Sequence, residues 1–171
     1  MTFMNIKPLS QQNMRWRNKR LGTSYTTIGG YGCLITCASM LLNWVGFYTN
    51  PAKLNIWLTE NGGYYEGNLF VWKSLKQLLP ELTFIAKYSG AALEEIDESL
   101  AKGMPAIVHV DFYPTTWDFQ DHWVLVIGKQ GNSYIINDPK DGKRIKFEDR
   151  YGDPAKKIYH VSTYSFYRED F

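Results

Sequence analysis

Apolar residues recur with a helical period in the first hundred positions of the chain and with the alternation of strands after that. The longest uncharged apolar run extends from Cys33 to Phe47. Its part from Cys33 to Val45 is apolar nearly all round and predicts a buried central helix that stops at Gly46. Residues 1–22 show no strong periodicity and predict irregular structure, and the glycine-rich residues 29–32 predict a turn.

Three further helices are expected in the same part of the chain. Asn50 is a helix cap, and Pro51 after it suits a first turn, so a second helix should run to about 61–63. An apolar stripe over 69–79 predicts a third helix, and residues 91–102 predict an amphipathic fourth. The helices thus precede most of the strand patterns.

Strand patterns dominate the second half. Short apolar or alternating segments, separated by Gly, Asn, Asp and Pro, predict strands at 83–88, 105–111, 122–127, 133–137, 143–147 and 157–163. Helices followed by strands predict an α+β fold, in which N-terminal helices and a central helix pack on a C-terminal antiparallel sheet. A length of 171 residues favours a single domain over residues 1–171.

Charge and composition exclude several classes of protein. A net charge of +2, from 19 basic and 17 acidic residues, is too small to indicate a nucleic-acid partner. The longest apolar run is too short to span a bilayer, and residues 1–7 lack the apolar core of a signal peptide. We therefore expect no membrane insertion and synthesis in the cytoplasm, with release by lysis or non-classical export left open.

A thiol stands at the expected start of the central helix. Unpaired N–H groups and the positive end of the helix dipole favour a thiolate there, so Cys33 is a candidate nucleophile. Cys37, one turn further and without a glycine turn, is interpreted as a packing residue, and the spacing of the two cysteines suits no disulfide. The Cys33 N–H can supply one oxyanion donor, and a side-chain amide such as Gln11 or Gln12 another.

A hairpin supplies a candidate base and acid. A five-residue loop centred on Gln130 would set His122 directly opposite Asp138, with their Cβ atoms about 5 Å apart. The imidazole would take the thiol proton, and the carboxylate would fix its tautomer. A one-residue shift would separate the two side chains, which leaves Asn137 and Asp141 as alternative orienting groups.

The other histidines and the possible metal ligands suggest less. His109 lies inside an apolar strand and is interpreted as a partnered core histidine, and His160 as a strand residue without a chemical role. A metal site made of Cys33, Cys37 and a histidine is disfavoured, because the chain has no HExxH motif and no paired CxxC motifs. No metal and no cofactor are expected.

Four short motifs occur in a fixed order, as Gln-x4-Trp at 11–16, Gly-Tyr-Gly-Cys at 30–33, His-Trp-Val at 122–124 and Asn-Asp-Pro at 137–139. Over about residues 8–140 this set resembles the C39-like group of papain-fold cysteine peptidases. The resemblance implies a papain-like fold with an oxyanion donor, a nucleophile, a base and an orienting acid at Gln11, Cys33, His122 and Asp138. Asn13 replaces the usual aspartate of the first motif, and Leu34 the usual glycine after the cysteine.

The function expected from the resemblance is peptide or amide hydrolysis through an acyl-enzyme, by a bacterial or phage cysteine peptidase that acts as a monomer. Its substrates would be bacterial peptides or the cross-links of peptidoglycan. Candidates for lining the substrate groove are Tyr31, Gly32, Tyr64, Tyr65, Trp123 and the loop 112–119. An acyltransferase with the same triad, as in phytochelatin synthase, and a non-catalytic peptide-binding domain with a vestigial site remain alternatives.

Overall fold

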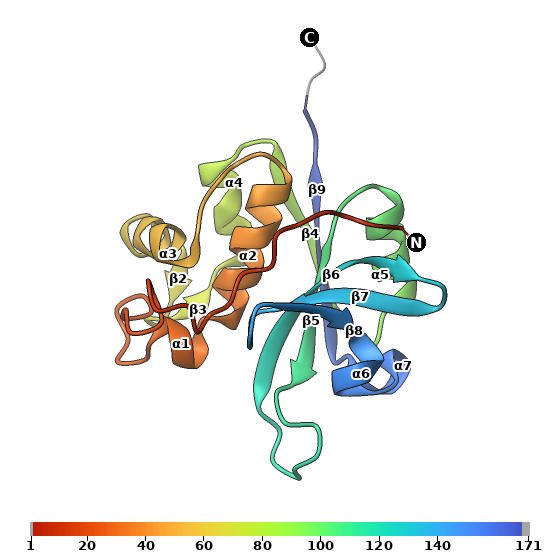
Figure 1. The fold of residues 1–171 in the computed structure, drawn as a ribbon. Coiled ribbons are helices and arrows are strands. Elements are labelled where there is room, and N and C mark those ends of the chain that lie inside the picture. The colour runs from red at the N-terminus through yellow and green to blue at the C-terminus, as the bar shows by residue number, and fades with distance from the viewer. Residues whose placement is uncertain (1, 169–171) are drawn as a thin grey trace.

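An antiparallel sheet of seven strands runs through the molecule (Figure 1). The computed structural model describes residues 2–168. The strands follow the spatial order β4 (Leu82–Ser89), β9 (His160–Phe166), β5 (Ala106–Asp111), β6 (Asp121–Gln130), β7 (Ser133–Asp138) and β8 (Lys143–Lys146), and β1 (Thr2–Phe3) pairs with β6. The predicted combination of helices with an antiparallel sheet is therefore confirmed.

Helices cover both faces of this sheet (Figure 1). One side carries α1 (Ile28–Tyr31), α2 (Cys33–Trp44), α3 (Pro51–Glu60) and α4 (Leu75–Leu78), with a small ribbon made of β2 (Tyr64–Tyr65) and β3 (Leu69–Phe70). The other side carries α5 (Leu93–Ala101), α6 (Phe147–Tyr151) and α7 (Pro154–Lys157). Two separate apolar cores result, one on each face. Within residues 2–168, no helix combines the length and the hydrophobicity needed to cross a membrane.

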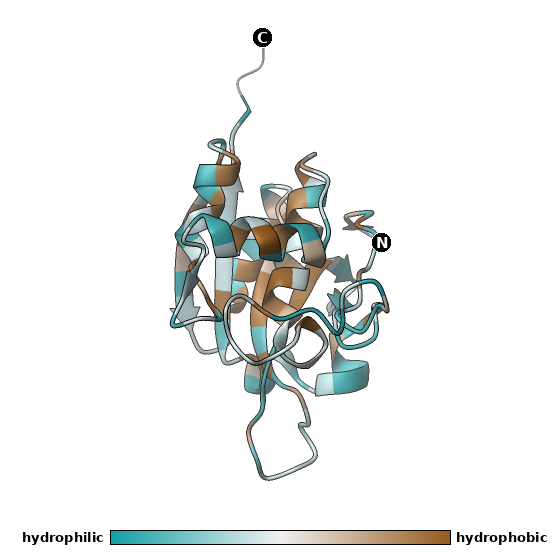
Figure 2. Cartoon of the chain, turned by 90° about the vertical axis from the view of Figure 1, so that its left-hand side faces the viewer, coloured by the Kyte–Doolittle hydropathy of each residue, from teal (hydrophilic) through white to brown (hydrophobic). Residues whose placement is uncertain are grey.

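The central helix α2 forms the larger core, as its apolar pattern predicts. Its side chains are buried around most of the helix, and they pack against strand residues such as Ile107 and Leu125. Figure 2 shows the apolar segments gathered at the centre of the molecule, with more polar segments outside. Burial of each large aliphatic side chain contributes about 2 kcal/mol. The helix ends one residue before the predicted Val45, and Gly46 follows with φ +92°.

The glycine-rich segment before α2 is helical, so the predicted turn at 29–32 was wrong. Thr27 caps α1 through its hydroxyl, which accepts the N–H of Gly30 at 3.1 Å. Gly32 then joins α1 to α2 with so little space that a Cβ atom there would lie 2.5 Å from the carbonyl oxygen of Ile28. Glycine at this position therefore permits the two helices to follow each other directly, which places Cys33 at a helix start.

The turn between β6 and β7 is tighter than the predicted five-residue loop. Gln130 pairs with Ser133, so the turn contains only Gly131 and Asn132. Gly131 has φ +63°, a conformation that two-residue hairpin turns need and that glycine adopts without strain. The loop centred on Gln130 was therefore wrong.

A register shift in β6 reduces this error by one residue and so makes it an even number. Ile127 bulges out of the pairing, and beyond it Leu125 lies opposite Asn137. If this register continues by one residue, Asp138 lies opposite Val124. That position is two residues away from His122, which the sequence had placed opposite Asp138. A two-residue displacement keeps both side chains on one face of the sheet as diagonal neighbours, whereas a one-residue displacement would have separated them.

Two other predicted elements differ from the structure. The third helix, expected over 69–79, is shortened because Leu69 and Phe70 form β3, and a 3₁₀ turn at Trp72–Ser74 precedes α4. Near the C-terminus, α6 and α7 interrupt the region between the last two predicted strands. Asp153 caps α7 by accepting the N–H of Ala155 at 3.0 Å, so the last strand begins at 160 rather than at 157.

Candidate active site

Cys33 is the first residue of α2, as predicted, and its side chain is buried apart from a small exposed fraction of 8%. The N-cap residue of α2 is Gly32, and no side-chain hydrogen bond in the described residues caps this helix start. The uncapped N–H groups and the helix dipole therefore face the thiol, and they can also stabilise an oxyanion beside it.

Cys37 lies one turn further along α2 and is fully buried. Its Sγ atom contacts the carbonyl oxygen of Trp123 at 3.5 Å. Burial first, and then the nearby Cys33 and Asp138, raise the pKa of the Cys37 thiol well above its usual value. Cys37 is thus kept protonated inside the core, which agrees with its interpretation as a packing residue.

His122 and Asp138 form a buried pair across the hairpin. Nε2 of His122 lies 2.7 Å from Oδ1 of Asp138, and the side chains are 1% and 0% exposed. Because Nε2 is occupied by the carboxylate, Nδ1 is the ring nitrogen left for Cys33. Burial alone lowers the pKa of His122, but the interactions with Asp138 and Cys33 outweigh it, and the net pKa is raised. The thiol, the imidazole and the carboxylate are thus brought together.

Asp138 has more partners than the predicted triad supplies. Its Oδ1 also accepts the backbone N–H of Lys140 at 2.9 Å, and its Oδ2 accepts the Tyr151 hydroxyl and Nη1 of Arg150, the latter at 2.8 Å. Burial raises the pKa of Asp138, but His122, the Tyr151 hydroxyl and the Lys140 N–H lower it to about 2. The carboxylate therefore stays ionised although no part of it is exposed.

Arg150 and Tyr151 are functional candidates that the motifs do not include. They lie on α6, in a region without a predicted helix. The sequence could have suggested them, because a buried carboxylate needs several hydrogen-bond donors. Arg150 and Tyr151 follow Asp138 by only 12 and 13 positions.

Gln11 lies beside the start of α2, where the N-terminal segment crosses it. Its backbone N–H donates to the carbonyl oxygen of Pro139 at 2.8 Å, and its Nε2 donates to that of Gly29 at 3.0 Å. The side chain is buried, and Oε1 has no partner among the described residues. The amide nitrogen carries a second hydrogen, so Gln11 can also donate to a group bound near Cys33.

The residues predicted to line a substrate groove lie in different surroundings. Tyr31, at the end of α1, is 66% exposed, and Gly32 follows it. Trp123 is half-buried between Trp72, with ring centroids 5.2 Å apart, and His109, at 4.5 Å. Both tryptophan contacts lie on the α2 side of the sheet.

Tyr64 belongs to a structural network instead. Its hydroxyl donates to Oδ1 of Asn55 at 2.8 Å, and Asn55 also binds the backbone of Arg20 and Gly22. These contacts give no support to its prediction as a groove residue. Tyr65 beside it is 62% exposed.

The loop between β5 and β6 extends beyond the sheet, at the bottom of Figure 1. Its first residue, Phe112, packs edge-on against the ring of His122 with centroids 4.9 Å apart. Phe119 contacts the ring of His109, while Trp117 near the tip is 96% exposed. This loop therefore borders both His122 and His109, and it exposes the Trp117 side chain.

A second polar cluster lies on the face of β6 opposite to the His122 side chain, which is the α2 side of the sheet. Nε2 of His109 lies 2.6 Å from Oδ1 of Asp121, and its Nδ1 lies 2.9 Å from Nδ1 of His160. His109 is thus a buried and partnered histidine, as predicted, whereas His160 has a partner that its sequence position did not reveal. In residues 2–168, no three His, Cys, Asp or Glu side chains converge as metal ligands do.

Comparisons with known proteins give a family and a structural neighbour for this chain. A family model described as Peptidase_C39 like family matches residues 3–165. A crystal structure of a Bacillus anthracis protein, provisionally described as a C39-like peptidase, is similar with a TM-score of 0.58. The two chains are 16% identical, and the match covers 98% of this chain and 96% of the other, so the likeness concerns the fold. A search of curated proteins gives no significant match.

Proposed function

Since the chain belongs to the Peptidase_C39 like family, we propose that it is a cysteine peptidase that uses Cys33, His122 and Asp138 as its triad. One observation carries the proposal: the buried His122–Asp138 pair leaves Nδ1 of His122 for the thiol at the start of α2. The helices and sheet would then form a papain-like domain over residues 1–171.

The first half of the reaction forms an acyl-enzyme. The Cys33 thiolate attacks the carbonyl carbon of a peptide or amide, and the oxyanion is stabilised by the Cys33 N–H and by Nε2 of Gln11. As the C–N bond breaks, the His122 imidazolium donates its proton to the leaving amine. Asp138 keeps the imidazole oriented and stabilises its charged form.

The second half releases the acyl group. His122, now neutral, takes a proton from water, and the resulting hydroxide adds to the thioester carbon. The C–S bond then breaks, which gives a carboxylic acid and the Cys33 thiolate, while His122 is again protonated. The proton that His122 gave to the leaving amine is thus replaced by a proton from water, which restores the starting state of Cys33 and His122.

Alkylation by iodoacetamide tests the nucleophile. Cys33 should react fast and with a strong pH dependence, while the buried Cys37 serves as the internal control. The His122→Ala variant should lose the fast phase. Equal and slow labelling of both cysteines in the wild type would sink the assignment of Cys33.

A substrate screen tests the activity. Wild-type protein and Cys33→Ala are compared on peptides, Gly-Gly peptides and peptidoglycan fragments, which are the substrate classes that we propose for a bacterial or phage enzyme. Cleavage by the wild type only is expected. Cleavage that survives Cys33→Ala would contradict the proposed mechanism.

The same triad could pass the acyl group to an amine or a thiol instead of water, so the products decide between hydrolase and acyltransferase. An amine added to the cleavage reaction should leave the free acid as the main product.

We also propose that the protein is a monomer, made in the cytoplasm and released by lysis or non-classical export. Size-exclusion chromatography with light scattering tests the first of these, and fractionation of cells the second.

A further inference from the structure

The guanidinium group of Arg150 bridges two carboxylates, one from Asp138 of the candidate triad and one from Asp141. Nη1 of Arg150 donates to Oδ2 of Asp138 at 2.8 Å and to Oδ1 of Asp141 at 3.1 Å, and its Nη2 donates to Oδ2 of Asp141 at 2.7 Å. The Arg150 side chain is only 22% exposed. Its charge is therefore poorly screened by solvent, and its direction is fixed by three hydrogen bonds.

We propose that Arg150 is a positioning residue of this site, which holds Asp138 on His122 and offsets the negative charge of Asp141. The effect of Arg150 on catalysis rests on the proposed function, whereas its effect on the titration of His122 can be measured without any activity. The hydrogen bonds of the Arg150 side chain go to Asp138 and Asp141, so it would act on the imidazole and the thiol through Asp138.

The geometry explains why only one of two acidic residues pairs with His122. Both oxygens of Asp141 are bound to Arg150, and its side chain is 32% exposed. Asp138 is fully buried, with Oδ1 on His122 and Oδ2 on Arg150. The guanidinium thus keeps Asp141 at the rim and pulls Asp138 into line with the imidazole.

The charges predict effects of opposite sign for the two partners. The titratable groups around His122 and its partners are Cys33 and Cys37 on α2, Asp138 on β7, Lys140, Asp141 and Lys143 next to it, and Arg150 and Tyr151 on α6. Without Arg150, Asp138 keeps its hydrogen bonds to the Tyr151 hydroxyl and the Lys140 N–H and so stays beside His122. The two carboxylates have then lost the cation that they share, which favours protonated His122. Removal of the Asp141 charge leaves the Arg150 guanidinium offset by Asp138 alone, so the surroundings of His122 are less negative and protonated His122 is disfavoured.

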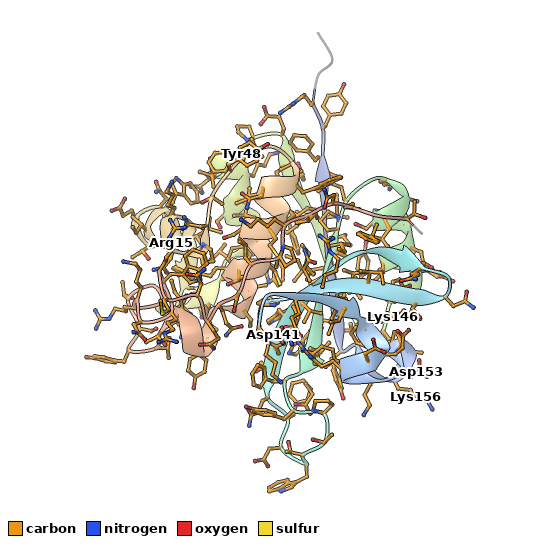
Figure 3. All side chains as sticks on the ribbon, in the orientation of Figure 1. Arg15, Tyr48, Asp141, Lys146, Asp153 and Lys156 are labelled. Carbon is orange, nitrogen blue, oxygen red and sulfur yellow. The ribbon has the colours of Figure 1, made fainter. Side chains whose placement is uncertain are left out.

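The experiment is an NMR titration of the His122 ring in the full chain. Arg150→Met should raise the midpoint of the titration by about one pH unit, and Asp141→Asn should lower it by a similar amount. The double variant should return the midpoint to within a few tenths of a unit of the wild type, since both charges are gone. Lys156→Met, a charge removed from the exposed end of α7 away from Asp141 (Figure 3), is the matched control and should shift nothing.

Shifts of the same sign for Arg150→Met and Asp141→Asn would overturn the proposal, and so would a double variant that does not return. If Arg150→Met does not fold, Asp141→Asn still decides, because Asp141 lies at the rim and its expected shift has a definite sign. The Arg150→Lys variant keeps the charge but loses the fork. It should leave the titration nearly unchanged, yet lower kcat about tenfold or more with an unaltered KM.

The activity measurements separate this proposal from the peptidase assignment. Absence of any cleavage by the wild type would contradict the proposed function, while the titrations would still decide the electrostatic role of Arg150. Cleavage by the wild type together with unshifted titrations would leave the peptidase standing and remove Arg150 from its positioning role.

Discussion

His109 and His160 meet through like ring nitrogens, with Nδ1 to Nδ1 at 2.9 Å, so only one of the two atoms can carry a proton. Asp121 accepts a hydrogen bond and cannot donate one while ionised, so Nε2 of His109 carries the hydrogen on that side. In the neutral pair His160 is therefore the donor and His109 the acceptor. Protonation of His109 would break this hydrogen bond while His160 keeps its proton on Nδ1, because both facing nitrogens would then be donors.

The pair predicts a loss of stability in mild acid. Burial lowers the pKa of His109 against the opposing effect of Asp121, so the folded state binds this proton less readily than the unfolded chain does. Its stabilising contribution is thus complete above about pH 6.5 and falls as the pH drops below that value. The thermal midpoint of His109→Gln should fall less between pH 7 and pH 5 than that of the wild type. An equal slope for both proteins would argue against this.

His122 predicts an effect at the opposite end of the pH scale. Its folded-state pKa is raised to about 9, above the unfolded value of about 6.5. The stability that it contributes is fully present below pH 6.5 and is lost as the pH rises through 9. Peptide hydrolysis should also decline above pH 9, because the imidazolium is then lost.

The Asp138→Asn variant should move this alkaline limb toward pH 6.5. It should also lower kcat by about 10²- to 10⁴-fold, because the imidazole loses its fixed tautomer. The checks are the pH profile of kcat/KM and calorimetry across pH 6–10. A limb that stays near pH 9 in the variant would rule out Asp138 as the partner that raises the pKa.

Gln11 and Gln12 offer a matched pair for the oxyanion hole. Both Nε2 atoms donate to the carbonyl oxygen of Gly29, at 3.0 and 2.6 Å. Gln11→Ala should lower kcat about 10²- to 10³-fold with little change in KM, as loss of an oxyanion donor does. Gln12→Ala removes a similar structural hydrogen bond and should leave kcat within about twofold. Equal losses in the two variants would indicate that only the anchoring of Gly29 matters.

Gly32 sets the position of Cys33, and its replacement should be costly. A methyl group there would meet the carbonyl oxygen of Ile28 at 2.5 Å, so Gly32→Ala should destabilise the protein by about 2 kcal/mol. For a chain of this size, the thermal midpoint should fall by about 4–8 °C. Gly30→Ala is the control, because the nearest atom to its new Cβ lies 3.3 Å away in a side chain. A similar fall for both would indicate a general helix effect.

The sequence predicts those parts of the site that depend on the local pattern of apolar residues and on the pairing of neighbouring strands. The apolar run from Cys33 predicts α2 to within one residue, and the hairpin prediction places His122 and Asp138 on one face. The register was nevertheless wrong, because neither the tight turn at Gly131 nor the bulge at Ile127 can be read from hydrophobic alternation. Their combined error was an even number of residues, which kept the two side chains together.

The remaining parts of the site depend on tertiary contacts. Arg150 and Tyr151 lie on a five-residue helix with no periodicity long enough to detect, and only their contacts with Asp138 give them a role. Tyr64 was predicted to line the substrate groove, and its hydroxyl is hydrogen-bonded to Asn55 in a structural network. Such pairings depend on how separate elements pack, which composition and spacing do not determine.

The anchoring of the N-terminal segment has a consequence for folding kinetics. The backbone bond from Gln11 to Pro139 and the bond from Asn137 to the carbonyl oxygen of Ile6 join positions about 130 residues apart. Contacts of such long sequence separation carry a large loop-closure cost and form late. During refolding, reactivity of Cys33 should therefore recover after the far-UV circular dichroism signal, since the last loop to close is the one that completes the site.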